Sequence, residues 1–378
     1  MRKTGRRGTA LIAVGAGLTL VLTACGANSS GGGGGAGSSS PSAGAGGGAK
    51  VGVVLPDTAS SARYESFDRP LLDKALRAEG LDPDIQNAQG DVQKFSALAD
   101  GMINNGVKVL ILDAPNTDVG AAVEKKAQAA GIPTIDYDRL NLGGSSDYYV
   151  SFDNTKVGAL QGQGLVQGLA GKPGAQVIEI EGAATDNNGT LFYEGQQTVV
   201  GPMYKSGALK LVASQRIPNW DNQAGGTTFE QFLTANGGKV DGVLAANDGL
   251  AGAVITVLKK TGLNGKAIVT GQDATPDGLQ AILRGDQYMT VFKPISDEAN
   301  AAAKLAGALA KGDKAGADAQ ATASTQDTKA NRAVKSVLLT PILITKDKVK
   351  QVVDQGSVKA SDICVSETQA ACDQLGIK

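Results

Sequence analysis

Polar side chains follow almost every predicted strand of this 378-residue chain. They mix carboxylates, amides and cations with aromatic residues: Arg63, Tyr64, Asp138, Arg139, Asp186, Asn188, Trp220, Asn247, Asp273 and Lys293. Asp accepts hydrogen bonds, Arg and Lys donate them, and Asn does both, so the set can satisfy the hydroxyls of a neutral polyol. Trp220 and Tyr64 are candidates to cover the C–H face of a pyranose ring. A phosphate site would instead use glycine-rich loops without acids.

Each of these residues also has a purely structural explanation. Asp and Asn after strands are common as turn residues and helix N-caps, and we expect Asp248, at the start of a helix, to be a cap. Residues 186–188 could form a turn, Asp138 and Arg139 an exposed ion pair, and Trp220 part of the core. The interpretation as a binding site therefore depends on all of them meeting at one edge of a sheet.

The composition excludes several classes of function. The chain contains no histidine, which excludes Ser-His-Asp and Cys-His catalysis, histidine-ligated zinc and histidine pH switches. Its 36 basic and 37 acidic residues leave no basic excess for binding nucleic acid. We find no nucleophile elbow, phosphate loop or metal-ligand cluster, so we predict no cofactor, no metal and no catalytic residue. A glycosidase that uses two carboxylates stays open on composition alone.

The first 49 residues have the composition of a targeting segment and a linker. Four basic residues precede an apolar run over residues 10–22, which is typical of a secretory signal and too short for a stable membrane span. Cys25 stands where a bacterial lipobox places its lipidated cysteine; a plain signal peptide with an incidental cysteine is the alternative. The glycine-rich stretch that follows cannot bury enough apolar surface to fold. We expect a signal peptide over 1–24, a lipidated Cys25 with a linker over 25–49, and a body on the outer face of the bacterial cell membrane.

The other two cysteines lie close together near the C-terminus. Three cysteines are too few for a disulfide scaffold or an iron–sulfur cluster. Translocation would place the body in an oxidising compartment, so we predict a disulfide between Cys364 and Cys372 that closes a short C-terminal loop. Two buried free thiols are the alternative.

From Lys50 onward, short apolar runs alternate with helical stretches, which predicts parallel sheets covered on both faces. The first set has strands at 50–55, 84–86, 107–112 and 133–137, with helices at 65–79, 91–105 and 117–130. The second set has strands at 176–181, 209–215, 242–246 and 267–270, with helices at 188–204, 228–235, 248–261 and 276–284. A strand at 148–152 lies between the two sets, and a strand at 288–292 and a helix at 296–311 follow the second set. The remainder comprises a polar, weakly structured stretch at 312–334 and two late strands at 337–339 and 342–344.

This restart of the pattern predicts an α/β fold with two lobes of similar build. Three chain crossings between the lobes are expected, at 153–154, 293–294 and 340–341. Ligands of open parallel sheets bind beyond the carboxyl ends of the strands, where the polar residues lie. The predicted lobes are 50–153 plus 294–339, and 154–293 plus 340–378.

Several segments, in order along the chain, resemble the periplasmic sugar-binding proteins of the ribose and galactose type, and most closely their D-xylose-binding members. The segments are Ala62-Arg63-Tyr64, Ile135–Arg139, Ser151–Gly158, Asp186-Asn187-Asn188, Asn247-Asp248, Gly271-Gln272-Asp273, Met289–Pro294 and Leu339-Thr340-Pro341. Together they run through most of the body. The chain departs from that family at Tyr64, where a tryptophan is expected, and over 58–62, where a more charged stretch is expected.

The resemblance implies the type I periplasmic binding protein fold, in which two Rossmann-like lobes joined by a three-segment hinge close on a sugar. It implies sugar contacts from Arg63, Asp138, Arg139, Asp186, Asn188, Asn247, Asp273 and Lys293, with stacking by Tyr64 and Trp220. The protein would be a monomeric substrate-binding lipoprotein, not an enzyme, that delivers a monosaccharide such as D-xylose to an ABC permease. The alternatives are a sugar-sensing receptor that signals to a membrane kinase, or binding of another aldose such as glucose, galactose or arabinose.

Overall fold

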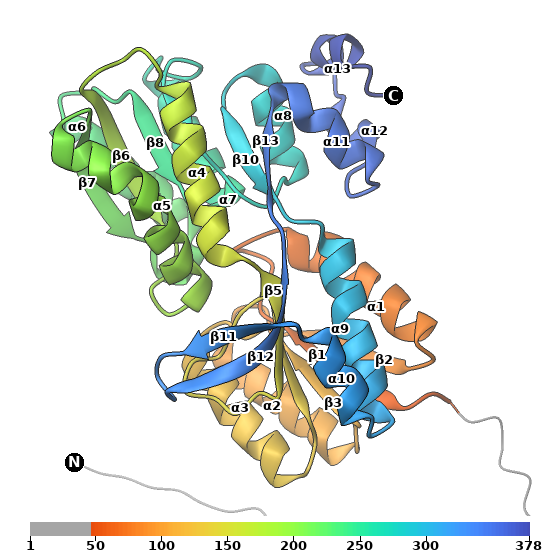
Figure 1. Ribbon diagram of the computed structural model, residues 1–378. Coiled ribbons are helices and arrows are strands. Elements are labelled where there is room, and N and C mark those ends of the chain that lie inside the picture. The colour runs from red at the N-terminus through yellow and green to blue at the C-terminus, as the bar shows by residue number, and fades with distance from the viewer. Residues whose placement is uncertain (1–46) are drawn as a thin grey trace, which may run out of the picture. The chain divides into compact units, whose positions relative to one another are not determined.

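The computed structural model describes residues 47–378 (Figure 1). The predicted signal peptide, Cys25 and most of the predicted linker lie outside the described residues. Within 47–378, no helix is both long enough and apolar enough to cross a membrane. The described part of the chain has an α/β fold with two lobes and mostly parallel sheets, which confirms the predicted fold class.

The first lobe is built on a seven-stranded sheet in the order β11-β12-β5-β4-β3-β1-β2. Its neighbouring strands are parallel, except for the antiparallel pair of β11 and β12 at one edge. The strands are β1 (Lys50–Leu55), β2 (Asp82–Asn87), β3 (Val109–Leu112), β4 (Thr134–Tyr137), β5 (Tyr148–Phe152), β11 (Ala323–Asp327) and β12 (Arg332–Leu339).

Helices cover both faces of this sheet because its inner strands are apolar on both sides. Val53 packs with Leu76 and Ala302 on one face, and its neighbour Val54 packs with Phe95 and Val123 on the other. The alternation follows from the two-residue period of a strand. The helical segments of this lobe are η1 (Tyr64–Asp68), α1 (Arg69–Ala78), α2 (Val92–Asn104), α3 (Thr117–Ala129), α9 (Ile295–Ala310) and α10 (Lys314–Gln320).

The second lobe contains a four-stranded parallel sheet in the order β7-β6-β8-β9 and a two-stranded antiparallel sheet of β10 and β13. In β6, Val177 packs on one face with Leu165, and Ile178 packs on the other with Phe229 and Leu250. The strands are β6 (Ala175–Glu181), β7 (Leu209–Arg216), β8 (Gly242–Ala245), β9 (Ile268–Val269), β10 (Met289–Phe292) and β13 (Ile342–Thr345).

Helices α4 and α5 cross closely on one face of this sheet (Figure 1). A Cβ added at Gly158 would collide with the Phe192 carbonyl, and one at Gly195 would collide with the Thr155 carbonyl, so glycine is required at both contacts. The helical segments of the second lobe are α4 (Asn154–Gly168), α5 (Asn187–Ser206), η2 (Pro218–Trp220), α6 (Asn222–Ala235), α7 (Asp248–Lys260), α8 (Pro276–Arg284), η3 (Lys346–Lys348), α11 (Val349–Asp354), α12 (Ala360–Ile363) and α13 (Gln369–Leu375).

The C-terminal helices form a small unit against α8 and the two-stranded sheet. Val352, Ile363 and Cys372 are buried in one apolar cluster with Ile282 and Ile344. A disulfide links Cys364 to Cys372. The short loop that this disulfide closes is therefore part of a packed unit of the second lobe.

Three chain crossings join the lobes, and they lie where the sequence placed them. The chain passes from β5 to α4, from β10 to α9, and from β12 to β13. The two late strands thus belong to different sheets. The lobe boundaries themselves stay a prediction.

Two predictions of local structure are wrong. Residues 312–334 are not weakly structured, because they contain α10, β11 and the start of β12. The pattern of apolar residues does not predict the hairpin of β11 and β12. Its outer strand, β11, has the sequence Ala-Ser-Thr-Gln-Asp, lies at the sheet edge and shows no alternation of apolar residues. The helix predicted at 228–235 begins at Asn222, because Asp221 accepts a hydrogen bond from the Ala224 amide and caps it there.

Candidate functional site

The residues that follow the strands serve first as helix caps. Asp186 accepts a hydrogen bond from the Asn188 amide at the start of α5, and Asn247 accepts one from the Leu250 amide at the start of α7. Capping fixes each side chain at the carboxyl edge of the sheet. Asp248 was expected to cap α7 and does not; its carboxylate makes the contacts described below.

The carboxyl ends of the strands from both lobes surround a small cavity. Nine of the ten residues predicted as ligand contacts line this cavity. A larger hollow lies on the surface of the second lobe and contains none of the ten. Within residues 47–378, no group of three or more acidic or cysteine side chains is arranged to hold a metal. The cavity is lined by Ser60, Ser61, Tyr64, Asp138, Arg139, Asp186, Asn188, Phe192, Trp220, Asn247, Gln272, Asp273 and Lys293.

Arg63 is the one predicted contact residue that does not line the cavity. Its side chain is buried behind Asp138, and its guanidinium donates to Asp68 (2.7 and 2.9 Å), Asp138 (3.0 Å) and Glu298 (2.9 Å). Three acidic side chains therefore occupy its donors. Arg63 holds Asp138 in place rather than forming the cavity wall.

Asp138 is fixed by charges on one side and by the hinge on the other. Its carboxylate lies 3.0 Å from Arg63 Nη1 and 3.4 Å from Lys293 Nζ. Its carbonyl accepts hydrogen bonds from Ser151 Oγ (2.8 Å) and from Asn188 Nδ2 (3.0 Å). Burial alone would raise the pKa of Asp138, but the charges of Arg63 and Lys293 outweigh burial and hold that pKa below its usual value. The side chain therefore stays an anion.

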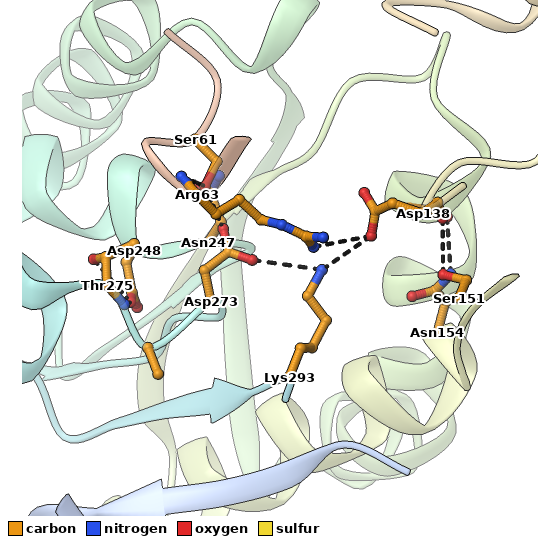
Figure 2. Close-up of polar contacts among 12 residues, drawn as sticks. Ser61, Arg63, Asp138, Ser151, Asn154, Asn247, Asp248, Asp273, Thr275 and Lys293 are labelled. Atoms are coloured by element: carbon orange, nitrogen blue, oxygen red, sulfur yellow. Dashed lines mark hydrogen bonds and ion pairs between the residues drawn. The ribbon is translucent and has the colours of Figure 1, made fainter. Parts of the chain in front are cut away.

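A chain of alternating charges crosses the cavity (Figure 2). Lys293, next to the second crossing, stands between Asp138 Oδ1 (3.4 Å) and Asp273 Oδ1 (3.5 Å). Asp273 Oδ2 accepts a hydrogen bond from Ser61 Oγ (2.9 Å), which belongs to the other lobe. Among the described residues, Asp273 Oδ1 and Gln272 Oε1 are buried and accept no hydrogen bond. Burial raises the pKa of Asp273, and Lys293 opposes that rise. These two oxygens, which accept no hydrogen bond from the described residues, suit a ligand that brings hydroxyl donors.

Arg139 and Tyr64 form the first-lobe wall. Arg139 Nη2 donates to the Tyr64 hydroxyl (2.8 Å), and Arg139 Nε lies 3.2 Å from Asp186 Oδ2 across the cleft. The guanidinium groups of Arg63 and Arg139 each lie over the Tyr64 ring, 5.3 and 5.4 Å from its centroid, as in a cation–π contact. Asp138 and Arg139 are buried, so they are not the exposed ion pair that we considered as an alternative.

Trp220 forms a flat wall on the second-lobe side. Its indole Nε1 donates to Asp186 Oδ2 (3.0 Å), and its ring meets Phe192 edge-on with centroids 6.2 Å apart. A Cβ at Gly182 would overlap the indole, so the chain leaves room for the ring at that point. The Asp186 carboxylate thus caps α5, orients the Trp220 indole and faces Arg139.

Several residues of the cavity have a left-handed backbone that favours glycine. The φ angles are 59° at Asp138, 56° at Trp220 and 103° at Asp273. Each such conformation costs on the order of 1–3 kcal/mol in a residue other than glycine and persists where the surrounding structure imposes it. Strained backbone at three charged or aromatic positions around one cavity indicates a functional site.

The first-lobe loop after β1 contacts the second lobe directly. Asn247 Nδ2 donates to the Ser60 carbonyl (3.0 Å), and Asn222 Nδ2 donates to the Ala59 carbonyl (3.2 Å). With the bond from Ser61 to Asp273, these contacts close the cleft. Sequence analysis missed Ser60, Ser61, Phe192 and Gln272 as lining residues; Gln272 follows a predicted strand, while the serines carry no distinctive local signal.

Glu298 should make the stability of the protein depend on pH. It is fully buried and shares Arg63 with Asp68 and Asp138, and burial raises its pKa to about 8. The unfolded value is about 4.3, so the folded protein binds a proton that the unfolded chain releases, and stability falls as pH rises from about 4.3 to 8. We expect Glu298→Gln to flatten this fall in thermal unfolding scans between about pH 5 and pH 8. Glu230→Gln, at an exposed position of α6, is the control and should keep the wild-type slope. Equal slopes in all three proteins would contradict the assignment.

Comparison with protein families gives a match over residues 51–314 to the periplasmic binding protein domain. The chain is 36% identical over 315 residues to the D-xylose-binding periplasmic protein of Escherichia coli, covering 83% of this chain and 92% of that protein. It is 33% identical over 332 residues to the multiple sugar-binding periplasmic receptor ChvE of Rhizobium radiobacter, covering 82% and 91%.

The fold is also similar to that of solved structures. One is a carbohydrate transporter solute binding protein from Chloroflexus aurantiacus, solved in complex with D-glucose. It aligns with a TM-score of 0.75 and 31% identity, covering 82% of this chain and 97% of that one. These sequence and structural similarities extend through both lobes.

Proposed function

The chain belongs to the periplasmic binding protein domain family, and from that premise we propose that it captures a monosaccharide in its cleft and delivers it to an ABC permease. It is a binding protein of a transport system and not an enzyme. The observation that carries the proposal is the cavity between the lobes, where paired charges, unpaired acceptors and one indole ring face each other.

The charge arrangement supports a neutral ligand. In the part of the chain that the structure describes, each cation beside the cavity already faces carboxylates: Lys293 faces Asp138 and Asp273, and Arg139 faces Asp186. An anionic ligand would have to compete with those carboxylates. A sugar hydroxyl can donate to Asp273 and accept from Lys293 without disturbing the charge balance.

The ligands named for relatives and for a structural neighbour support a sugar as the ligand. Relatives are named for D-xylose and for multiple sugars, and a structural neighbour holds D-glucose. We propose D-xylose as the ligand, through contacts to Asp138, Asp186, Asn188, Asn247, Asp273 and Lys293 and stacking on Trp220.

Tryptophan fluorescence offers a direct test of this function. Trp220 is the only tryptophan in the chain and lines the cavity. Titration with D-xylose should change its emission saturably, with a dissociation constant of about 1 μM or tighter. Parallel titrations with D-glucose, D-galactose and L-arabinose rank the four sugars by dissociation constant. An unchanged emission with all four, together with no heat in calorimetry, would contradict a sugar-binding role.

We further propose that the protein is a monomer tethered outside the cell membrane through a lipidated Cys25 and the glycine-rich linker. Cys25→Ala should release the protein from the membrane fraction of the producing cells, because the lipid would have no attachment point. The double variant Cys364→Ala/Cys372→Ala is the matched control and should stay membrane-bound. Cys25→Ala remaining in the membrane fraction would contradict the anchor.

A further inference from the structure

The loop that presents Asp273 has an unusual backbone. Asp273 and Ala274 are consecutive non-glycine residues with φ angles of 103° and 51°. Such a pair is stable only where contacts around it impose the conformation. The result of that conformation is that the Asp273 carboxylate faces Ser61 and Lys293 in the cleft (Figure 2).

Asp248, the first residue of α7, contacts both ends of this loop. Its amide donates to the Gln272 carbonyl (3.0 Å), just before the strained pair. Its Oδ2 accepts from the Thr275 amide (2.9 Å) and the Thr275 hydroxyl (3.2 Å), just after the pair. Figure 2 shows Asp248 and Thr275 side by side, on the far side of Asp273 from Lys293. One residue therefore fixes the loop at both ends.

The other oxygen of Asp248 extends this network to β10. Oδ1 accepts from Gln287 Nε2 (2.8 Å) and from the Thr290 hydroxyl (2.9 Å). The Thr290 hydroxyl in turn accepts from the Ala274 amide (3.2 Å), inside the strained pair. The bonds of Asp248 thus reach the start, middle and end of the loop.

The Asp248 carboxylate is buried and tightly enclosed by its neighbours. The residue is 5% exposed. A Cβ at Gly271 or at Gly278 would collide with its carboxylate oxygens. Four donors point at these two oxygens, which is the full capacity of a carboxylate. An asparagine at this position would turn its NH₂ group, itself a donor, toward two of these four donors, and those two would lose their acceptor.

We propose that Asp248 is a positioning residue of the sugar site, which holds the Gln272–Thr275 loop so that the Asp273 carboxylate stays aimed into the cleft. Asp248 does not line the cavity itself. The inference rests on the proposed sugar-binding function.

Asp248→Asn tests the inference with D-xylose as the probe. We expect the affinity to fall about tenfold, because two buried donors lose their acceptor and the loop relaxes. Asp277→Asn is the matched control: Asp277 lies in the first turn of α8 and makes no ion pair or side-chain hydrogen bond among the described residues. It should bind D-xylose as the wild type does.

A double-mutant cycle separates positioning from general destabilisation. If Asp248 acts through Asp273, adding Asp248→Asn to an Asp273→Ala variant should lower the affinity for D-xylose hardly at all. If Asp248→Asn acts by a general loss of stability, its effect on the affinity should add to that of Asp273→Ala. Should Asp248→Asn fail to fold, Thr290→Val replaces it in the cycle, since it removes the hydroxyl between Asp248 and Ala274 and keeps the volume. Additive losses in the cycle, or wild-type affinity in Asp248→Asn, would overturn the inference while leaving the proposed function intact. Absence of D-xylose binding in the wild type would overturn both.

Discussion

Trp220→Ala is expected to lower the affinity for D-xylose about a hundredfold, the effect of removing a buried aromatic residue that carries about 2–3 kcal/mol of a binding energy. The indole is held in place by its hydrogen bond to Asp186 and its edge-on contact with Phe192, and the absence of a side chain at Gly182 leaves room for it. It is therefore preorganised as a flat surface before the sugar arrives. Calorimetric titration measures the loss directly.

Two further variants make this prediction specific. Trp220→Phe keeps an aromatic face and loses only the bond to Asp186, so its affinity should lie between those of the wild type and Trp220→Ala. Tyr193→Ala removes an aromatic ring of α5 that packs on Arg216 (5.2 Å) and does not line the cavity. Tyr193→Ala should bind normally. Loss of affinity in Tyr193→Ala to the same extent as in Trp220→Ala would contradict a stacking role.

Asp138→Asn is expected to reduce both stability and sugar affinity. Arg63 and Lys293 would each lose one buried anionic partner, and breaking a buried ion pair costs about 3–5 kcal/mol. The cavity would also lose its central acceptor, so we expect an affinity at least about thirtyfold weaker. Chemical denaturation and calorimetry measure the two effects separately.

Asp68→Asn distinguishes these effects because it lies behind the cavity wall. Asp68 also pairs with Arg63 and is fully buried, but it does not line the cavity. Its replacement should cost comparable stability and much less affinity. Asp100→Asn, which breaks an exposed pair with Lys126, should change neither. Equal affinity losses in Asp68→Asn and Asp138→Asn would show that Asp138 acts only by stabilising the fold.

Much of the fold could be predicted because its signals are local. Buried strands such as β1 and β3 are short apolar runs, and helices such as α2 begin at a capping residue, Asp91. Local signals failed for the β11 hairpin, whose polar strand lies at a sheet edge, and for the start of α6.

Most of the candidate site could be predicted from the sequence, but its details could not. Nine of the ten predicted residues line the cavity, because parallel strands deliver their carboxyl ends to one edge. Four further lining residues, Ser60, Ser61, Phe192 and Gln272, were not predicted. The sequence could not show that Arg63 lies behind Asp138, nor that Asp248 clamps a loop instead of capping a helix. Those roles depend on partners far away along the chain, such as Glu298 for Arg63 and Gln287 for Asp248.

The central claim is that side chains from both lobes enclose one neutral sugar without altering it. A crystal structure of the protein grown with D-xylose tests this claim most directly. We expect one intact sugar ring in the cavity, stacked on Trp220 and hydrogen-bonded to Asp138 of the first lobe and Asp273 of the second. A sugar bound elsewhere on the surface, or held by residues of one lobe alone, would contradict the account.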